Sequence, residues 1–432
     1  MSDIKVKKMK VKIYTLWAIL LIGKPILGQN VTLVMCLEAA QKTATGTKQK
    51  EIEQELDKLN ARIIQTGWLP QVSLNGQTTY QSDVTGLAIE IPNLHMTPIN
   101  KDQYKTFVDV NQLIYDGGAS KIKTMLQEIS SKNTLTRIQL ANRNLLQETL
   151  KIYFSALLAQ ENRLIWETAK EEILARKSVL EAGIRFGART KNQLDILAVE
   201  LLKIEQQITD IRAAKNIAVD MLNILTGLKL NSDDSFQIPV DIQKIAPLSY
   251  ETYEMKLLQN QQSLVATTED LNQSKLRPKA FLFGQGGYGN PALNMLKNEF
   301  QSYYIMGLRL NWDLSSFYTK HLNEKSTQLQ KELIHQNQSD LERQLTMQYT
   351  KISEEVKRYE KLIQQDESII SIRERISVSA ASELDQGTIT ATQFITEKNA
   401  EKLAKQSYLL HKIQKLAFLQ DASLVFDSNS SF

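Results

Sequence analysis

The most regular pattern in the chain is a pair of apolar rows within residues 183–227. In each row an apolar side chain recurs every seven residues, and Lys215 interrupts one of the rows. Two rows at heptad spacing are typical of a helix that packs along another helix for many turns. The stretch therefore predicts a helix that follows a glycine-bearing turn and pairs with a neighbouring helix. The rows are Leu197, Ile204, Ile211, Ala218 and Leu225, and Leu194, Leu201, Ile208 and Leu222.

The turn before these rows is repeated near the other end of the chain. Both copies of the turn stand between long stretches with helical periodicity, so the chain is predicted to contain the same helix–turn–helix unit twice. The repeated positions are Gly187, Thr190 and Gln193 in the first copy and Gly387, Thr390 and Gln393 in the second.

Each copy also contains two stretches in which apolar and polar residues alternate. A period of two places successive side chains on opposite faces of a strand. The pattern predicts four strands, over about 70–82, 104–116, 278–289 and 300–315. Their polar face supplies the candidates for the lining of an aqueous lumen, which are Ser73, Asn75, Gln77, Asp109, Asn111, Arg309, Asn311 and Asp313.

These patterns predict a mainly α-helical fold with a small β part and two internal repeats. The first repeat covers 29–227, and begins with one helix over about 33–67 that ends before Pro70. The second repeat covers 249–420. The helical hairpins span 118–227, with a tip at about 183–191, and 317–420, with a tip at about 383–390. An irregular connection covers 228–248, and residues 421–432 are expected to be a disordered tail.

The N-terminus has the pattern of a secretory signal peptide. Five lysines precede the apolar run Ile13–Ile22, and the small residue Gly28 follows, so residues 1–28 are expected to be removed after export. Ten apolar residues are too few to span a bilayer. These 28 residues carry six Lys and one Asp, so the formal charge of +4 falls to about −1 without them. That balance gives no electrostatic support for binding nucleic acid.

The four expected strands have the alternation of a transmembrane barrel, with an apolar face, a polar face and aromatic ends. A small soluble sheet with one face in water is the alternative. Four strands cannot close a pore, and open edges are not tolerated in lipid. A barrel would therefore take strands from several chains, and three chains would supply twelve.

No catalytic or ligand-binding set is recognisable in the sequence. The four histidines, His95, His321, His335 and His411, lack the spacing of metal ligands. The glycine-rich stretch 284–289 has no helix after it and no following lysine, so it does not predict a phosphate loop. The single cysteine, Cys36, excludes a disulfide within the chain and sits on the apolar side of a helical pattern. We therefore expect neither an enzyme nor a cofactor or metal site.

Charged residues gather near the two expected hairpin tips. One interpretation is that they are solvated helix ends; the other is that they pair between hairpins and hold the end of a duct closed. Single exposed pairs contribute little, so only a set repeated by symmetry could act as a gate. The candidates for docking and gating at the tips are Gly183, Arg185, Phe186, Gly187, Arg189, Thr190, Asp195, Glu383, Asp385, Gly387, Thr390 and Gln393.

Seven segments in order resemble the TolC-like outer-membrane efflux proteins, in the branch typical of Bacteroidetes. VTLVMCLEAA resembles the opening helix of that family, TGWLPQVSLNGQ and LRPKAFLFGQGGYG its helix-to-strand passages, and NQLIYDGG the end of its second strand. LNMLKNEFQSYYIMGLRLNWDL resembles the second strand pair, and RFGARTKNQLDIL and LDQGTITATQF resemble the two periplasmic turns. Asp195 matches an acidic position of the first turn, where the second turn has Gln393, and Arg189 stands where glycine is frequent.

The resemblance implies a homotrimer with a twelve-stranded barrel in the outer membrane and a long α-helical tunnel through the periplasm of a Gram-negative bacterium. It also implies a periplasmic adaptor and an inner-membrane pump of the ABC, RND or a similar class as partners at the tips. The expected function is a passive exit duct for small molecules or polypeptides, in tripartite efflux or type I secretion. A soluble periplasmic coiled-coil adaptor or scaffold is the alternative.

Overall fold

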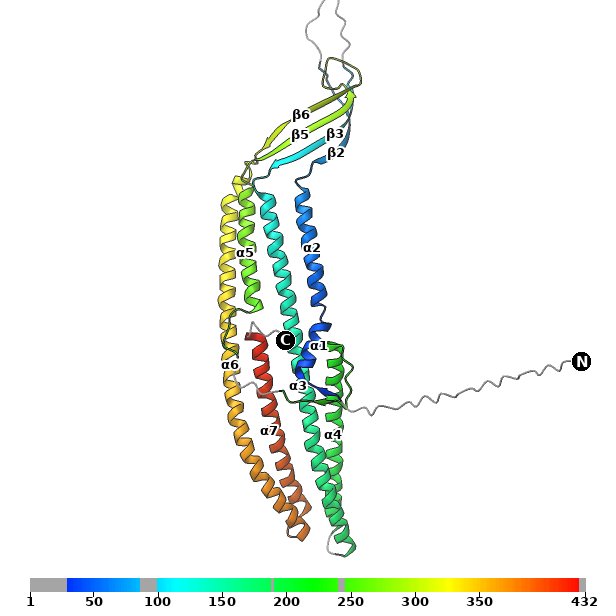
Figure 1. The fold of residues 1–432 in the computed structure, drawn as a ribbon, viewed down its shortest axis with the longest axis vertical. Helices are drawn as coiled ribbons and strands as arrows, with labels where there is room; N and C mark the ends of the chain where they lie inside the picture. The colour runs from blue at the N-terminus through cyan, green and yellow to red at the C-terminus, as the bar shows by residue number, and fades with distance from the viewer. Residues whose placement is uncertain (1–28, 86–98, 188–189, 240–244, 427–432) are drawn as a thin grey trace, which may run out of the picture.

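The computed structural model shows a long molecule with a small sheet at one end and two helical hairpin tips at the other (Figure 1). Helices run between the two ends nearly parallel to the long axis. The structure describes residues 29–85, 99–187, 190–239 and 245–426. The expected signal peptide, Arg189, His95 and residues 427–432 lie outside these ranges.

The first repeat contains the sheet's first strand pair and one long hairpin. Helix α3 has 67 residues, which corresponds to a length on the order of 100 Å. Its C-terminal part packs against α4, as the heptad rows predict. The elements are β1 (Asn30–Val31), α1 (Leu33–Thr43), α2 (Gly46–Thr66), β2 (Gln71–Tyr80), β3 (Asp102–Tyr115), α3 (Ala119–Arg185) and α4 (Lys191–Thr226).

The second repeat follows the same order, after a connection that contains the short strand β4. Its long helix α6 has 71 residues, and α6 packs along α7 as α3 packs along α4. The elements are β4 (Ser235–Phe236), α5 (Tyr253–Ser274), β5 (Lys279–Asn290), β6 (Gln301–Asn311), α6 (Ser316–Gln386) and α7 (Ala391–Phe426).

Two of the sequence-based expectations about elements are wrong. The single helix over about 33–67 is two helices, because the backbone at Ala44 is extended and a second helix starts at Gly46. A Cβ at Gly46 would lie 2.4 Å from Asn142 Oδ1, so the glycine allows the start of α2 to pack directly on α3. The tail expected from residue 421 is helical through Phe426, since Ala422, Leu424 and Phe426 are buried.

The main sheet has four antiparallel strands in the order β2-β3-β5-β6. The two hairpins β2-β3 and β5-β6 therefore meet through β3 and β5, and β2 and β6 are the edge strands. A second, parallel sheet joins β1 to β4 near the middle of the long axis.

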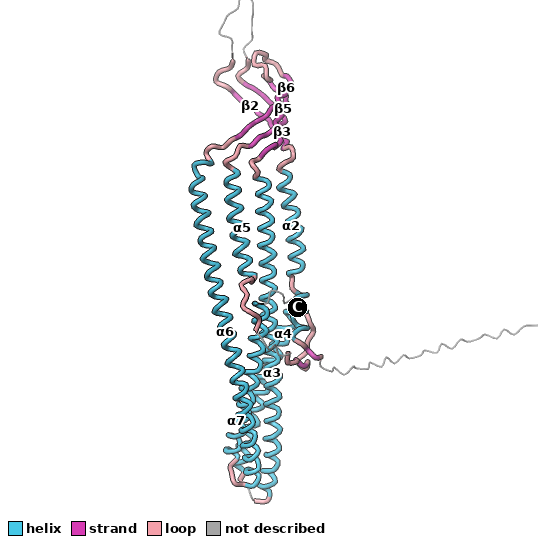
Figure 2. Tube along the Cα trace, turned by 60° about the vertical axis from the view of Figure 1, so that its left-hand side comes forward, coloured by secondary structure: helices cyan, strands magenta, loops and turns pink. Residues whose placement is uncertain are grey.

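The helices form a wall of the same order as the strands. Next to the sheet, α2, α3, α5 and α6 lie side by side (Figure 2). Nearer the tips the order is α4, α3, α7 and α6, because α4 takes the place of α2 and α7 that of α5. The wall thus has α6 at one edge and α2 followed by α4 at the other; α1 packs on α3 and α4, and α4 also contacts α7.

The main apolar core lies at the level of the β1–β4 sheet, where α1, α3, α4 and α7 meet. Tyr153 is fully buried there, and its hydroxyl lies 2.6 Å from the carbonyl oxygen of Gln237. Cys36 is fully buried in the same cluster, as the helical pattern predicts. A second core joins the two hairpins near their tips.

We expect Cys36 to resist alkylation in the native protein. Burial raises the pKa of its thiol to about 12, and the reactive thiolate is scarce far below the pKa. Iodoacetamide at pH 8, followed by mass spectrometry, should label Cys36 only after denaturation. A matched control is Phe186→Cys in a Cys36→Ser background, which places a single thiol on an exposed turn. Equal labelling of both native proteins would contradict the assigned burial.

Candidate functional site

The four-stranded sheet has one polar and one apolar face, and the strand register decides which residues share them. Ser73 pairs with Asp109, and Asp109 pairs with Gln285 of β5. Because pairing partners point to the same side of a sheet, the polar residues of neighbouring strands form one surface. This polar surface holds Ser73, Asn75, Gln77, Asp109, Asn111, Arg309 and Asn311.

Asp109 is the centre of a hydrogen-bond network on the polar surface. Asn75 Nδ2 donates to Asp109 Oδ2 over 2.9 Å, and Gln285 Nε2 donates to Asp109 Oδ1 over 2.8 Å. The network therefore ties three strands together through one carboxylate. Gln285 is not among the sequence candidates, because its neighbours Gly284, Gly286 and Gly287 hide the alternation that would mark it.

Arg309 also lies on the polar surface, where its guanidinium carbon is 4.6 Å from the centre of the Phe283 ring. A cation over an aromatic face is favourable and holds the side chain in place. Asp313, by contrast, lies beyond β6, which ends at Asn311. Its carboxylate accepts hydrogen bonds from Ser315 and Ser316 at the start of α6. Asp313 therefore belongs to the passage from strand to helix.

The opposite face of the sheet is apolar and exposed in the single chain. Leu74 and Leu308 are 74 % and 76 % exposed. A continuous exposed apolar surface of this kind marks contact with lipid or with another protein. Its members on the strands include Val72, Leu74, Tyr80, Tyr104, Val108, Leu282, Tyr288, Tyr304, Met306, Leu308 and Leu310.

Aromatic residues stand at both ends of the apolar face. At the end far from the helices, Phe300 stacks on Tyr288 at 5.6 Å and lies 6.5 Å from Tyr104. At the helix end, the indole of Trp312 donates to the carbonyl of Leu276 and packs against Phe317. Aromatic side chains at two levels flanking an apolar band are typical of the outer surface of a membrane barrel.

The two open edges of the wall expose further apolar rows. Edge helix α2 carries a row at helical spacing, and edge helix α6 carries another. Residues three or four positions apart share one face of a helix, so each row is a continuous strip. The strip on α2 is Ile52, Leu56, Leu59 and Ile63; that on α6 is Leu322, Leu329 and Leu333.

At the tips, each hairpin turns on a glycine with positive φ, which is 74° for Gly187 and 89° for Gly387. Left-handed backbone of this kind strongly favours glycine. In the second tip, Thr390 and Gln393 form a capping box: Gln393 Oε1 accepts from Thr390 N, and Thr390 Oγ1 accepts from Gln393 N. In the first tip, Thr190 precedes α4 without such a bond to its side chain.

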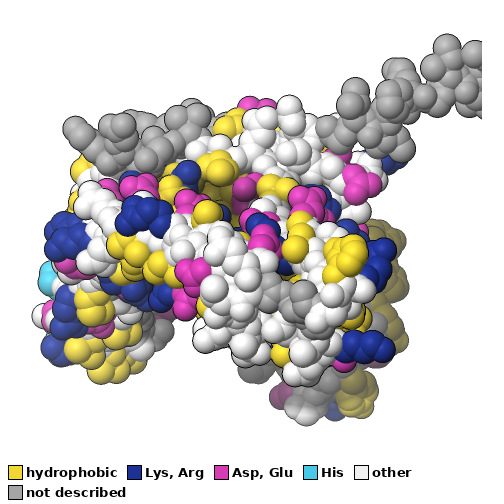
Figure 3. Space-filling model, turned by 90° about the horizontal axis from the view of Figure 1, so that it is seen from below, with side chains coloured by type: hydrophobic (Ala, Val, Ile, Leu, Met, Phe, Trp, Pro, Cys, Tyr) yellow, Lys and Arg dark blue, Asp and Glu magenta, His cyan; other side chains and the backbone are white. Residues whose placement is uncertain are grey.

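The first tip presents an apolar side chain to solvent. Phe186 follows the last residue of α3, Arg185, and is 88 % exposed. Asp195, on the first turns of α4, is exposed as well, whereas Gly183 lies inside α3. Figure 3 shows the end that carries the tips, with basic and acidic side chains placed among apolar ones.

The structure brings Asp385 next to Arg176 of α3, with which it forms an ion pair. This pair joins the second hairpin to the first. Arg373 pairs with Glu397 at 3.1 Å inside the second hairpin, whereas Glu383 accepts a hydrogen bond from Ser379 of its own helix. Sequence reasoning missed Arg176, because 209 residues separate it from Asp385 and no local pattern marks it.

A buried charge cluster lies further from the tips, on α7. Lys398 forms ion pairs with Glu401 and with Glu172 of α3, and Lys405 bonds to Glu401 and to Glu374 of α6. Lys398 and Glu401 are both buried. Burial alone would raise the pKa of Glu401, but hydrogen bonds from Lys398, Lys405 and Ser377 outweigh it and lower the pKa to about 2. The cluster therefore holds α3, α6 and α7 together through charged hydrogen bonds.

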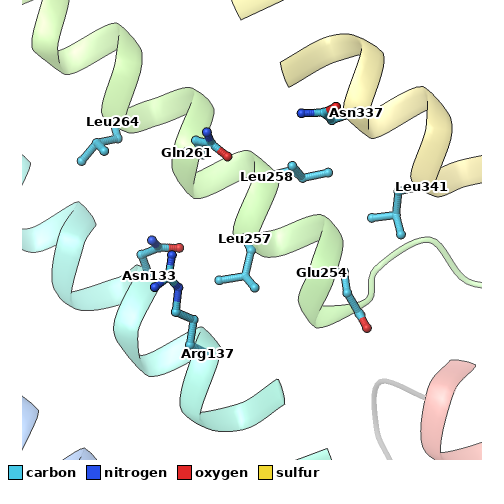
Figure 4. Close-up of a pocket in the computed structure, with 9 residues that line it drawn as sticks. All are labelled: Asn133, Arg137, Glu254, Leu257, Leu258, Gln261, Leu264, Asn337 and Leu341. Atoms are coloured by element: carbon cyan, nitrogen blue, oxygen red, sulfur yellow. The ribbon is translucent and has the colours of Figure 1, made fainter. Parts of the chain in front are cut away.

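A groove of about 550 Å³ lies between α3, α5 and α6 (Figure 4). It is lined by leucines of α5 and α6 and by the polar residues Asn133, Arg137, Glu254, Gln261 and Asn337. Arg143 donates hydrogen bonds to both carboxylate oxygens of Glu254. The residues that line the groove include no Ser, Cys or His.

Within the described ranges, no group of three His, Cys, Asp or Glu side chains could hold a metal ion. His411 Nδ1 lies 2.6 Å from Asp366 Oδ2, and His321 and His335 are exposed on α6. None of the described helices is long and apolar enough to cross a membrane.

The comparisons with known proteins agree with this geometry. Residues 47–228 match the family model described as outer membrane efflux protein, a match that covers less than half of the chain. No curated protein is a significant relative by sequence.

Solved structures match over nearly the whole chain. The outer membrane protein VceC of Vibrio cholerae is 13 % identical with a TM-score of 0.69, over 91 % of this chain and 94 % of that one. The CmeC outer membrane channel of Campylobacter jejuni is 15 % identical with a TM-score of 0.69, over 91 % and 85 %. The open state of the MtrE outer membrane channel of Neisseria gonorrhoeae is 13 % identical with a TM-score of 0.61, over 91 % and 88 %.

At such identities these matches establish the fold. The chain has the fold of the TolC-like channels, mostly helical with a small sheet, and this prediction from the sequence is confirmed. The roles assigned to the lumen and tip residues stay predictions.

We expect Glu401→Gln to destabilise the helical wall at neutral pH. Because the pKa of Glu401 in the folded protein lies below its ordinary value of 4.5, its stabilising effect is full above about pH 4.5 and is lost as the pH falls toward 2. The melting temperature, followed by far-UV circular dichroism in detergent, should therefore drop at pH 7 and approach that of the wild type in acid. Glu354→Gln removes an exposed pair and is the control. A loss independent of pH would contradict the assigned charge state.

Proposed function

We propose that the protein is an outer-membrane exit duct built from three copies of this chain, which carries small molecules or polypeptides passively from a periplasmic adaptor and an inner-membrane pump to the exterior. The observation that supports this best is the open wall. Its sheet has an exposed apolar face with aromatic ends, a polar face, and two unpaired edge strands.

A ring of several copies of the chain would pair the backbone groups of the two edge strands. Three antiparallel steps separate β2 from β6, so the two edge strands run in opposite directions, and β6 of one copy can pair with β2 of the next in the same antiparallel pattern. Backbone groups in lipid need such partners. Three copies give twelve strands, an even number with room for a lumen.

The helical wall supports the same closure. Edge helices α2 and α6 both expose apolar strips, as the edges of the sheet expose backbone groups. Packing the α6 strip of one copy near the α2 strip of the next would remove both from water, which is favourable at about 25 cal/mol per Å². The duct would then continue from the barrel through the helices.

The tips are the proposed contact with adaptor and pump, since they lie at the far end from the sheet. Phe186 is 88 % exposed there, so a partner that covered it would bury a large apolar side chain. Asp385 and Arg176 are the proposed gate, because their pair holds the second hairpin to the first. The pump class stays open between ABC, RND and similar pumps, and the Bacteroidetes-type branch rests on the sequence motifs alone.

The oligomeric state and the pore are tested together. Membranes should release the protein only in detergent, and the purified species should have the mass of three chains and conduct ions in planar bilayers. A chain that appears in the soluble fraction after osmotic shock, as a monomer without conductance, would contradict the duct and favour the periplasmic scaffold.

Asp385→Ala should raise the single-channel conductance or open probability. It removes the ion pair with Arg176 that joins the two hairpins, and Arg176→Ala should act in the same direction. Glu383 is the other acidic gate candidate, and Glu383→Ala is the comparison. Among the described residues its side chain bonds to Ser379 of its own helix turn, so we expect a smaller change in conductance. The double variant should behave like Asp385→Ala. Unchanged conductance in both Asp385 and Arg176 variants would rule out this pair as a gate.

Phe186→Glu should weaken efflux in cells several-fold without lowering conductance in planar bilayers. The change places a charge where an apolar partner surface is expected, and we expect it to leave the wall intact because the Phe186 side chain is 88 % exposed. Efflux is measured as resistance or substrate accumulation in a strain that lacks its own duct but carries the matching pump and adaptor. Full efflux by Phe186→Glu would show that this residue does not contribute to docking.

A further inference from the structure

The backbone of Gln29 is hydrogen-bonded on both sides, to Asp234 and to Ser235, the first residue of β4. Gln29 N donates to Asp234 Oδ1 over 2.7 Å, and Ser235 N donates to the carbonyl of Gln29 over 3.0 Å. Strand β1 starts at the next residue, Asn30, and pairs in parallel with β4. The first residue before the strand is thus fixed at the level of the main core.

Asp234 is buried, and several groups of the chain hydrogen-bond to it. Asp234 is 2 % exposed, its Oδ2 accepts from Asn231 N over 2.7 Å, and its carbonyl accepts from Lys215 Nζ over 2.8 Å. Lys215 is itself buried, and burial lowers its pKa. Among the described residues, however, no cation forms an ion pair with the Asp234 carboxylate; its two oxygens accept from backbone N–H groups alone.

Placing a carboxylate out of water is costly, and an added positive charge offsets part of that cost. The Lys215 ammonium bonds to the carbonyl of Asp234 and acts on its carboxylate through space, whereas the nitrogen of Gln29 bonds to the carboxylate directly. We propose that Asp234 is the acceptor site for the α-ammonium group that forms when the chain is cut between Gly28 and Gln29. The proposal rests on the export of the chain that the proposed function requires and on the cut after Gly28 that the sequence predicts, and it adds a receptor for the new terminus.

The chemistry of the step is a peptide hydrolysis by a signal peptidase. Water adds across the Gly28–Gln29 bond, so that Gly28 leaves with the new carboxylate and Gln29 keeps the amine. An α-amino group has an ordinary pKa of about 7.7–8.0, so it binds a proton at neutral pH. The neutral amide N–H that faces Asp234 then becomes a cationic donor, and charge-assisted hydrogen bonds are roughly twice as strong as neutral ones.

The position of the cut matters for this ion pair. A cut one or more residues earlier leaves an amide at Gln29 and moves the charge away, whereas a cut after Asn30 removes a residue of β1. Cleavage after Gly28 leaves one residue before the strand, with its nitrogen 2.7 Å from the carboxylate. Signal removal would then strengthen the β1–β4 sheet, which closes the main core.

The terminus can be read directly. Peptide mass spectrometry of the protein purified from outer membranes should show a mature chain that starts at Gln29 with a free amine. Protection by Asp234 should also keep that amine from attacking the Gln29 side chain, a cyclisation that expels ammonia. A different first residue, or a terminus found only as the cyclised lactam, would overturn the proposal.

The ion pair is tested by a two-by-two comparison. Asp234→Asn keeps the shape and removes the charge; one alanine inserted between Gly28 and Gln29, with cleavage before it, keeps the charge and moves it. In the chain that starts at Gln29, Asp234→Asn should lower the melting temperature by several degrees. In the chain with the inserted alanine it should have a clearly smaller effect. An equal loss in both chains would overturn the proposal.

Asp233→Asn is the matched control, because Asp233 is adjacent in sequence but exposed, and it should change neither chain. Conductance in planar bilayers separates this inference from the proposed function. Variants that conduct normally while the two-by-two comparison shows no coupling would reject the ion pair and leave the duct intact. A chain that starts at Gln29 and shows coupling but never conducts would reject the duct and keep the ion pair.

Discussion

Unpaired strand edges are the constraint on which the architecture depends. The four-stranded sheet ends in β2 on one side and β6 on the other, and each edge strand offers a row of backbone N–H and C=O groups. In water such edges invite pairing, and in a hydrocarbon layer they must be paired. The apolar face with its aromatic ends and the two edge strands both support the proposed ring of copies. A single chain is, on this view, one third of a wall.

The helices next to the sheet follow the same lateral order as the strands, and they extend the wall along the long axis of the molecule. The order β2-β3-β5-β6 continues as α2, α3, α5 and α6, and the two hairpins add α4 and α7 where α2 and α5 stop. Two apolar cores fix this arrangement, one at the level of β1 and β4 and one near the tips. Between them the buried charges of Lys398 and Glu401 bind α7 to its neighbours. Charges in this place require fully formed partners, which makes the packing of α7 specific.

The polar groups described above bind to other groups of the same chain and so hold its elements together. Asp109 joins three strands, Arg309 rests on Phe283, and Asp385 joins the two hairpins through Arg176. None of these groups faces a nucleophile or a base in a closed pocket. These contacts stabilise the wall on which the proposed duct depends.

Much of the fold could be read from the sequence, because its signals are local and repeated. Heptad rows marked α4, alternation marked the four strands, and Gly187 and Gly387 marked the tips, since in each case the side chains of one short stretch carry the pattern. The alternation also placed Ser73, Asn75, Asp109 and Arg309 on one face. It failed for Gln285 among glycines and for Asp313 beyond the strand end. It could not foresee the break before Gly46, because that break depends on a contact with Asn142 in another helix.

Long-range pairing was decided by the tertiary structure alone. Arg176 forms an ion pair with Asp385, and the backbone nitrogen of Gln29 donates to Asp234. Phe426 stays helical because it is buried in the core beside α6. These partners lie far apart in sequence. Other residues of the same charge or polarity stand close to each of them in the sequence, so a local pattern cannot single out the one that pairs. The sequence by itself determined the four strands of the main sheet, the long hairpins, their order and their two faces, since a period of two or of seven is a property of one segment. It did not determine the break before Gly46, the last turn of α7 or the short strands β1 and β4. The pairs that join the hairpins and hold the start of the described chain arise only when the helices are packed, because packing brings distant residues within bonding distance.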